Sequence, residues 1–293
     1  MGSPEVVTGL LGLGHLGRAI AARLLDDDAT LLVWNRSAEA CDAVAERGAE
    51  PVASVAELVE RCDLVLLCLD GADAVEEVVF GTDGVAAFAT EEQLLIDLSA
   101  TGPAATRRFA RELAQRSGMG WVDAPVLGDL EDAEQGTLVA VAGGDEDDVE
   151  RARPLLGRFC SRVTHMGEAG AGQAARLCHA LLAGAGVLAL AEMVAWAERN
   201  GVDTERLPEA LAGAPADSPL LQRAGMRMAV REFEPLLATT VALRRELELA
   251  LDGARASGAA LPLAALAAQL LRQQALRARP EEDLATLVEL YTE

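Results

Sequence analysis

The chain contains no lysine, because each of its 25 lysine-or-arginine positions holds arginine. Any mechanism that needs a titratable side-chain amine is therefore excluded. A guanidinium stays protonated near neutral pH, so arginine binds anions well but releases a proton poorly. Tyrosine is almost absent too. The chain has a single one, Tyr291, close to the carboxyl end. General acids must therefore come from a short list that includes three histidines.

Cysteine is scarce, and its spacing gives no sign of metal or disulfide chemistry. The five cysteines, Cys41, Cys62, Cys68, Cys160 and Cys178, form no CxxC pair and no metal-ligand spacing. We therefore expect no metal site, and reduced, buried thiols in a cytoplasmic protein. No segment resembles a signal peptide, and no apolar run reaches the length of a membrane span without a charge or a glycine.

The chain has far more acidic than basic side chains. Its 47 acidic and 25 basic residues give a formal net charge of −22. Such a charge repels nucleic acid and anionic membranes, so neither is an expected partner. With 293 residues, 51% of them hydrophobic, the chain can build one or two substantial cores.

Residues 6–17 read VVTGLLGLGHLG, a β-prone apolar run that ends in a GxGxxG turn. In a dinucleotide-binding fold Gly12 permits the tight turn, Gly14 lets the backbone approach a pyrophosphate, and Gly17 lets the following helix pack closely on its strand. The motif follows a strand and opens a helix, which favours nucleotide binding. The competing interpretation is a strand–turn–helix cluster in which the glycines serve packing alone.

Strand and helix patterns alternate along the first half of the chain. Strands are predicted at 6–11, 30–34, 64–69, 94–98, 121–124, 138–142 and 161–165. Helices are predicted at 18–25, 38–47, 55–60, 104–116 and 148–159. This alternation is typical of an α/β fold with a doubly wound parallel sheet, the Rossmann arrangement.

The pattern changes after residue 165. A helix of unusual length is predicted from about residue 169 to 200, and helices separated by glycine and proline follow it. We therefore predict two domains, a nucleotide-binding Rossmann domain over residues 1–165 and an all-α domain over residues 166–293. The long helix would connect them.

The residues after the second strand decide which cofactor is expected. NAD-binding folds of this type place a carboxylate there for the ribose 2′-hydroxyl. This chain offers Asn35, Arg36 and Ser37, whose donors suit the 2′-phosphate of NADP. NADPH is the expected cofactor, and the competing interpretation is that Arg36 is only a solvated residue after a strand.

Further cofactor contacts are expected at the carboxyl edge of the sheet, where ligands bind in such folds. The nicotinamide half would lie there, near the ends of the strands at 64–69 and 94–98. His15 and Leu16 belong to the glycine turn, where His15 would face the pyrophosphate. The complete predicted set is Gly12, Gly14, His15, Leu16, Gly17, Asn35, Arg36, Ser37, Leu69, Asp70, Ser99 and Thr101.

In their order along the chain, these motifs resemble the β-hydroxyacid dehydrogenase superfamily, which includes 3-hydroxyisobutyrate dehydrogenases, 6-phosphogluconate dehydrogenases and imine reductases. The matching segments are GLGHLG, VWNRS, DLVLLCLD, IDLSATGP, DAPVLGDLEDAEQGTL, HMGEAGAGQAARLCH and PEEDLATLVEL. The resemblance covers nearly the whole chain. It implies an NADP-binding Rossmann domain, a helical domain for substrate binding and dimerisation, an active site in the cleft between them, and a homodimer acting on a small molecule.

The chain departs from this superfamily at the catalytic positions. A segment that resembles GAGQAAKxxNN in relatives reads GAGQAARLCHA, with Arg176 at the lysine and His179 at the first asparagine. The substrate loop DxPVSGG reads DAPVLGD, with Leu127 for serine and Asp129 for glycine. In LRRELELA, similar to KDLxLA, Arg245 stands at a lysine and would reach the cofactor or substrate, or lie on a solvated helix face.

Two kinds of chemistry remain open at these positions. Carbonyl reduction needs an acid, and His179 shares a helix face with Arg176 at i+3 and is of a type that titrates between about pH 5 and 8. A protonated imine carries its own activating charge and needs no strong acid. The Arg176 guanidinium would repel the positive charge of an iminium, unless the substrate also bears a carboxylate or Asp129 lies between the two cations. His179 filling a domain interface is the structural alternative.

The predicted function is therefore an NADPH-dependent, imine reductase-like oxidoreductase that transfers hydride to a small C=N substrate. The alternatives are a hydroxyacid dehydrogenase-type C=O reductase and a catalytically inactive cofactor-binding dimer.

Overall fold

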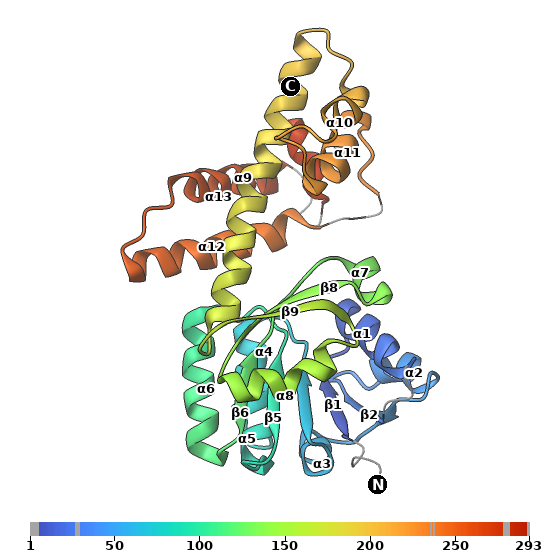
Figure 1. Ribbon diagram of the computed structural model, residues 1–293, viewed down its shortest axis with the longest axis vertical. Helices are drawn as coiled ribbons and strands as arrows, with labels where there is room; N and C mark the ends of the chain where they lie inside the picture. Colours follow the sequence, from blue (N-terminus) through green and yellow to red (C-terminus); the bar gives the residue numbers. More distant parts are fainter. Residues whose placement is uncertain (1–5, 27–29, 235, 237, 278–281, 292–293) are drawn as a thin grey trace. The chain divides into compact units, whose positions relative to one another are not determined.

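The computed structural model describes residues 6–26, 30–234, 236, 238–277 and 282–291. The chain divides into two compact units, Met1–Arg176 and Leu177–Glu293. The first is an α/β unit and the second is helical, as Figure 1 shows. The predicted fold class is confirmed, whereas the roles assigned to residues 1–165 and 166–293 stay predictions.

The first unit is built on one twisted sheet. Its strands are β1 (Thr8–Leu11), β2 (Leu31–Trp34), β3 (Glu50–Pro51), β4 (Leu64–Leu67), β5 (Leu94–Asp97), β6 (Gly120–Asp123), β7 (Val126–Leu127), β8 (Leu138–Gly143) and β9 (Cys160–Gly167). They lie in the order β3-β2-β1-β4-β5-β6-β8-β7, with β9 beside β8. Leu10 of β1 pairs with Val33 of β2 on one side and Leu66 of β4 on the other. The strand order reverses between β1 and β4, which is where ligands bind in open α/β sheets.

The far end of the sheet is mixed rather than purely parallel. Strands β1 to β6 pair in parallel, whereas β8 runs antiparallel to β6 and β7, and β9 pairs in parallel with β8. The short helix α7 (Leu130–Gln135) joins β7 to β8, and so short a connection reverses the chain direction. Because β7 has only two residues, its pairing leaves no alternating pattern in the sequence.

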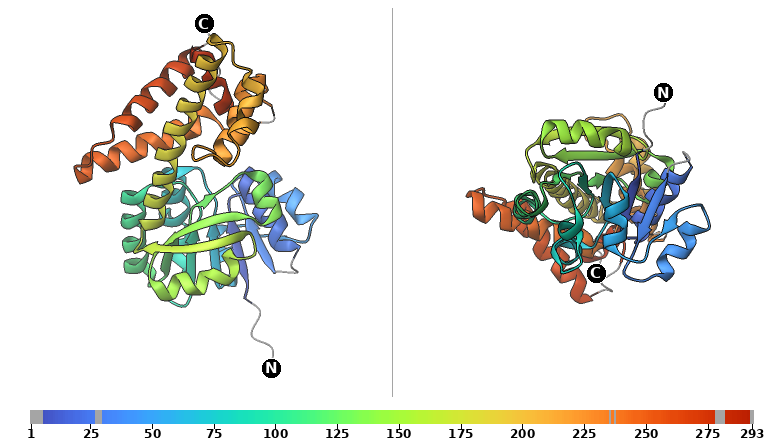
Figure 2. Two further views of the ribbon diagram at one scale, coloured as in Figure 1. Left: turned by 45° about the horizontal axis from the view of Figure 1, so that its top comes forward. Right: turned by 90° about the horizontal axis from the view of Figure 1, so that it is seen from below.

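Helices cover both faces of this sheet. They are α1 (His15–Leu25), α2 (Glu39–Ala45), α3 (Val55–Arg61), α4 (Gly71–Phe80), α5 (Val85–Phe88), α6 (Pro103–Ser117) and α8 (Glu146–Leu156), besides α7. Successive strand residues point to opposite faces, so Leu10 joins the core under α1, α2 and α8, and Leu11 joins the core under α3 to α6. Figure 2 shows the two helical layers. The sheet is thus buried on both sides, and its exposed positions are its edges.

Among its described residues the second unit contains helices and one isolated antiparallel bridge, between Thr239 and Asp283. The helices are most of α9 (Ala171–Arg199), η1 (Thr204–Arg206), α10 (Leu207–Leu211), the π-helical turn η2 (Leu221–Gly225), α11 (Met226–Val230), α12 (Thr240–Ser257), α13 (Pro262–Arg277) and η3 (Leu284–Tyr291). Thr239 caps α12, and its hydroxyl accepts a hydrogen bond from the Ala242 N–H group. Gly258 ends α12 in the left-handed conformation, so α12 and α13 form a helical hairpin.

Helix α9 alone, among the described helices, is long and apolar enough to cross a membrane by length and composition. Core helices of globular units pass the same test. In the second unit, Ala180, Val187 and Ala191 of α9 lie in a core shared with α12, α13 and η3. A Cβ on Gly184 would lie 3.0 Å from Leu247 of α12, so this glycine permits close helix packing. Packing within the second unit thus accounts for the buried apolar residues of α9, whereas Leu182 and Trp196 of the same helix are exposed.

Candidate cofactor site and catalytic residues

The glycine turn connects β1 to α1 and has room on one side only. Gly12 adopts φ +103°, and a Cβ there would lie 2.3 Å from the Cys68 carbonyl oxygen. A Cβ on Gly17 would lie 2.2 Å from the Gly12 carbonyl oxygen, so these two glycines are required by packing. At Gly14, by contrast, no described atom lies within 4 Å of a Cβ. The amino end of α1 is therefore open at Gly14, where its first N–H groups lack helical partners.

The loop after β2 is tied to this turn. The Asn35 side-chain oxygen accepts a hydrogen bond from the Leu13 N–H group at 3.0 Å, and its amide nitrogen donates to the Ser37 carbonyl oxygen at 3.0 Å. Asn35 thus holds two backbone segments in place. Arg36 and Ser37 are exposed, so their side chains are the donors that this loop presents to solvent.

His15 and Leu16 begin α1 and differ in environment. His15 is exposed, and its Nδ1 accepts a hydrogen bond from the Arg18 guanidinium at 3.4 Å. Leu16 is half-buried and packs against the core on that face of the sheet. A hollow of about 500 Å³ lies beside α1 and is lined also by residues of α7 and of the loop after α2; its lining is His15, Arg18, Ala19, Ala22, Arg23, Asp26, Arg47, Leu130 and Glu134. His15 therefore faces a partly cationic hollow beside the glycine turn.

The loops after β4 and β5 are joined by a side-chain hydrogen bond. The Leu69 N–H group donates to the Ser99 hydroxyl at 2.9 Å, and Ser99 is 3% exposed. Thr101, also 3% exposed, lies 2.6 Å from the Thr106 hydroxyl. Asp70 is exposed and precedes α4 as its N-cap residue. The hydroxyls of Ser99 and Thr101 are thus interior groups, and their direct contact with a cofactor stays a prediction.

Two buried carboxylates lie at the carboxyl ends of β5 and β6. Asp97 and Asp123 have no exposed surface. Burial raises the pKa of Asp97 to about 7, against the effect of hydrogen bonds from Ser99. Burial also raises the pKa of Asp123 to about 6, although it accepts N–H bonds from Gly170 and Gln173. Neither aspartate was predicted from the sequence, where the available signal was an acidic residue at the end of an apolar strand run.

Gln173, in the first turn of α9, is a further residue that the sequence analysis missed. It is 2% exposed. Its side-chain oxygen accepts a hydrogen bond from the Gly102 N–H group at 3.2 Å, and its amide nitrogen donates to the Ser99 carbonyl oxygen at 2.7 Å. Gln173 thereby connects α9 to the loop after β5.

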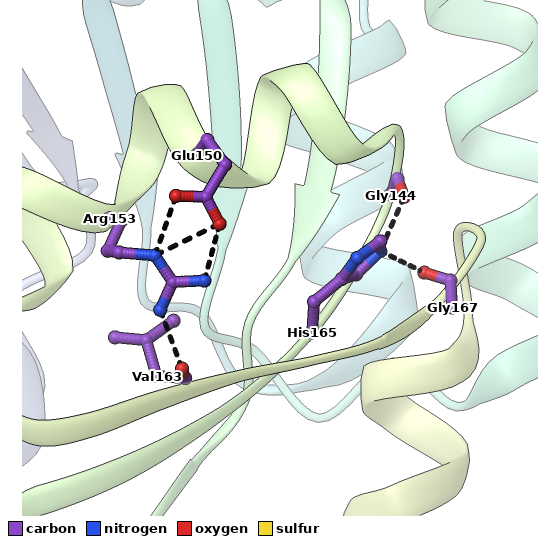
Figure 3. A network of polar contacts seen from close by, with 6 residues as sticks. All are labelled: Gly144, Glu150, Arg153, Val163, His165 and Gly167. Atoms are coloured by element: carbon purple, nitrogen blue, oxygen red, sulfur yellow. Dashed lines mark hydrogen bonds and ion pairs between the residues drawn. The ribbon is translucent and has the colours of Figure 1, made fainter.

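The segment that leads into α9 is held by a second polar cluster, shown in Figure 3. His165 Nε2 lies 3.0 Å from the Gly144 carbonyl oxygen and 2.8 Å from that of Gly167, so this nitrogen carries a proton and donates. Arg153 of α8 donates to the Val163 carbonyl oxygen at 2.7 Å and pairs with Glu150. These bonds fix β9 against the α8 side of the sheet.

The predicted catalytic and substrate residues of the first unit lie near β7. Arg176 is half-buried, and its guanidinium donates to the Val126 carbonyl oxygen at 2.9 Å. Leu127 is half-buried in β7. The Asp129 carboxylate caps α7 by accepting from the Asp132 N–H group at 3.0 Å. The structure thus brings Arg176 to the substrate-loop segment and gives Asp129 a capping role.

His179 and Arg245 belong to the second unit. His179 is exposed on α9, one turn after Arg176, and Arg245 is exposed on α12. Their assignment to catalysis and substrate binding stays a prediction. Within the described residues, no three side chains of His, Cys, Asp or Glu are grouped closely enough to hold a metal ion.

Two family models together match almost the whole chain. One, the NAD binding domain of 6-phosphogluconate dehydrogenase, matches residues 7–167. The other, described as the NAD-binding of NADP-dependent 3-hydroxyisobutyrate dehydrogenase, matches residues 170–291.

Individual relatives agree with these models. The 3-hydroxyisobutyrate dehydrogenase of Pseudomonas aeruginosa is 32% identical over 298 residues, which cover 96% of this chain and 97% of that protein. The structure of the 3-hydroxyisobutyrate dehydrogenase of Mycobacterium tuberculosis with L-serine has a TM-score of 0.89 and 27% identity, covering 97% of this chain and 98% of that one. An imine reductase from a Pseudomonas species has a TM-score of 0.65 and 19% identity, covering 97% and 99%. At that identity the likeness shows the fold alone.

Proposed function

The chain belongs to the family of 6-phosphogluconate and 3-hydroxyisobutyrate dehydrogenases and is an NAD(P)-dependent oxidoreductase. We propose that it uses NADPH to reduce a small substrate whose C=N bond lies beside a carboxylate. The observation that carries this proposal is Arg176, a guanidinium held at the substrate-loop segment in a chain without lysine. The cofactor supplies the hydride. The chain's own residues bind, orient and exclude water.

The glycine turn and the loop after β2 fit a phosphorylated dinucleotide. Gly14 leaves the amino end of α1 open to a pyrophosphate, and Asn35 fixes the loop that presents Arg36 and Ser37. No acidic side chain follows β2 in the position that would bind a ribose 2′-hydroxyl. An exposed guanidinium in that position favours the 2′-phosphate of NADP.

Arg176 supports a carboxylate-bearing substrate. A guanidinium binds a carboxylate through two parallel hydrogen bonds but donates its proton poorly. An iminium next to such a carboxylate keeps its own activating charge, so reduction at its carbon requires positioning rather than a side-chain acid. The missing lysine is compatible with this chemistry.

Reduction of a small oxo acid is the second candidate, and the dehydrogenase relatives favour it. An alkoxide forms in that reaction and must be protonated. His179, one helical turn beyond Arg176, is the residue we propose as the donor. A cofactor-binding protein without catalysis is the third possibility and is one outcome of the test below.

Three matched compounds distinguish these functions when NADPH oxidation is followed. They are pyrroline-2-carboxylate (C=N with a carboxylate), 2-methylpyrroline (C=N without one) and 2-oxovalerate (C=O with a carboxylate). We expect the first to react fastest. Faster turnover of the oxo acid would favour the second candidate. Binding of NADPH without any turnover would favour the inactive protein, and no binding would contradict all three.

Two variants test the residue roles in the same assay. Arg176→Gln should raise KM about tenfold to a hundredfold for carboxylate-bearing compounds and leave 2-methylpyrroline unchanged, because a charge-assisted hydrogen bond is lost. His179→Ala should lower kcat for the oxo acid about a hundredfold and leave the imines unchanged. Equal losses for all compounds would contradict both assignments.

We also propose that the chain forms a homodimer in the cytoplasm. Large apolar side chains of the second unit are exposed, with Leu276 at 89% and Leu182 at 78%. Burial of such residues by a second copy would remove them from water.

A further inference from the structure

The first turn of α9 is capped by a side chain from another element. The residues that precede the helix, Ala169 and Gly170, have no side chain that could accept its free N–H groups. Instead, the Asp123 carboxylate accepts hydrogen bonds from the Gly170 N–H at 2.7 Å and from the Gln173 N–H at 2.8 Å. An anion at this place also interacts favourably with the helix dipole.

Two glycines make the room for this carboxylate. A Cβ on Gly172 would lie 2.9 Å from one Asp123 carboxylate oxygen, and a Cβ on Gly143 would lie 2.7 Å from the other. The GEAGAG sequence, which runs into the first residues of α9, therefore serves a tertiary contact with β6. The cap is a built feature of the first unit.

The side chain of Gln173 extends the contact to two more loops. It binds the Ser99 carbonyl oxygen and the Gly102 N–H group of the loop after β5. The Ser99 hydroxyl in turn accepts a hydrogen bond from the Leu69 N–H group after β4. Leu69 lies beside the glycine turn, because a Cβ on Gly12 would lie 2.8 Å from the Leu69 side chain. A continuous route of contacts thus runs along the carboxyl edge of the sheet, from the glycine turn to α9.

We propose that Asp123 and Gln173 are positioning residues, which lock the turn of α9 that carries Arg176 to the loops that hold the nicotinamide half of the cofactor. This inference rests on the proposed function, and the two residues would affect ligand binding only by holding other residues in place. Both side chains are buried and bind backbone groups of the protein. Their proposed role is therefore to hold backbone segments in place rather than to contact a ligand.

Gln93 provides a matched control at the opposite edge of the sheet. Its amide nitrogen donates to the Val59 and Cys62 carbonyl oxygens, each at 2.6 Å, and its oxygen accepts from the Thr90 N–H group at 2.9 Å. Gln93 precedes β5, at the amino end of the strand, whereas Gln173 acts at the carboxyl end. Both glutamines join backbone segments through the two ends of the side-chain amide, although Gln93 is half-buried and Gln173 is buried.

The proposal is tested by comparing two ligands by calorimetry, namely NADP⁺ and its adenosine half, adenosine 2′,5′-bisphosphate. Gln173→Met keeps the side-chain volume and removes both side-chain hydrogen bonds. We expect it to weaken NADP⁺ binding about tenfold, the effect of one or two lost hydrogen bonds, and to change binding of the adenosine half less than twofold. Gln93→Met should leave both affinities unchanged, and Arg36→Ala should weaken both ligands.

The outcomes separate this inference from the proposed function. Unchanged NADP⁺ binding in Gln173→Met, or an equal loss for both ligands, overturns the positioning role while the function stands. If the unmodified protein binds neither ligand, the proposed function fails and the inference fails with it.

Gln173→Glu keeps the test informative if the methionine variant does not fold. A protonated glutamic acid presents the same acceptor and donor as glutamine, whereas its anion cannot donate to the Ser99 carbonyl oxygen. The charged groups of this region are the carboxyls of Asp97 and Asp123 and the guanidinium of Arg107 on α6, which acts on Asp123. Relative to the unmodified protein, NADP⁺ affinity of this variant should increase severalfold from pH 8 to pH 6.5. A pH-independent ratio would contradict the proposal.

Discussion

Asp97 shows how a buried carboxyl can be accommodated without a cation. Three close contacts link the Asp97 carboxyl, the Thr101 and Thr106 hydroxyls and the Gly102 carbonyl oxygen, at 3.5, 2.6 and 3.0 Å. The Thr101 hydroxyl donates to the Asp97 carboxyl, and the Ser99 N–H group donates to it at 2.9 Å, so both bonds favour the charged form. Burial outweighs them and raises the pKa of Asp97 to about 7.

This arrangement predicts that stability falls as the pH rises. Between the ordinary pKa near 4 and the raised values of about 7 for Asp97 and about 6 for Asp123, the folded protein binds more protons than the unfolded chain. The free energy of unfolding should therefore decrease from pH 5 to pH 8, by on the order of 2 kcal/mol through Asp97. Urea unfolding at a series of pH values measures this dependence.

Asp97→Asn should flatten the same curve, because an amide does not titrate over this range of pH. Asp83→Asn, at an exposed aspartate in the turn before α5, is the control and should keep the full pH dependence. A stability that rises with pH over this range would show that Asp97 is ionised and well stabilised in the folded protein.

Helix α1 is the element in which packing and ligand binding can be separated. Its turn holds Gly17 against the backbone of Gly12, whereas Gly14 faces open space. The two glycines belong to one motif in the sequence but have different physical tasks. One is required for the helix to approach its strand, and the other leaves the helix end accessible.

We expect alanine at these two positions to give different phenotypes. Gly17→Ala should lower the free energy of unfolding by about 1–3 kcal/mol, since its Cβ would lie 2.2 Å from the Gly12 carbonyl oxygen. Gly14→Ala should leave stability nearly unchanged, because φ is −64° and no described atom is close. It should nevertheless weaken NADPH binding at least tenfold by blocking approach to the backbone. Chemical unfolding and fluorescence titration measure both, and normal NADPH binding by Gly14→Ala would contradict the assignment of the turn.

Net charge and exposed apolar surface act in opposite directions at the scale of the whole molecule. The charge of −22 favours separation of the chains. The exposed leucines of α13, Leu263 at 68% and Leu266 at 57%, favour association. Dimer formation therefore depends on apolar contact strong enough to exceed the repulsion.

Light scattering and sedimentation should give a mass of twice 30.6 kDa. Leu266→Glu should shift the protein toward the monomer, because it places a charge in the buried interface. Val6→Glu adds the same charge at a residue of the first unit that is 54% exposed, and should leave the dimer intact. A monomeric unmodified protein, or equal effects of the two variants, would overturn the proposed interface.

Local patterns predicted the framework of the fold well. The strands around Leu10, Leu66 and Ile96 are apolar runs buried on both faces, and such runs are visible in one sequence. The glycine turn and the long helix were also predicted, because their signals lie in residues that are close along the chain. The reversal at β7 and β8 was not, because a two-residue strand has no periodicity.

The site was less predictable than the framework. Ser99 and Thr101 were predicted to contact a cofactor because of their place after β5, and this contact stays a prediction; the structure adds that both hydroxyls are buried in hydrogen bonds within the protein. Asp129 was expected to bind substrate, and its carboxylate caps α7. Sequence position gives the edge of the sheet on which a residue lies, but not the direction of its side chain.

The sequence by itself determined the α/β class of the first unit, the helical character of the second, the glycine turn, and the absence of any side-chain amine. Each of these follows from residues that are close along the chain or from composition alone. Only the tertiary structure decided that Asp123 caps α9 and that Gln173 joins it to Ser99, because these partners are 50 and 74 residues apart in sequence. Contacts at such separations are made when distant elements pack together, and no local pattern encodes them.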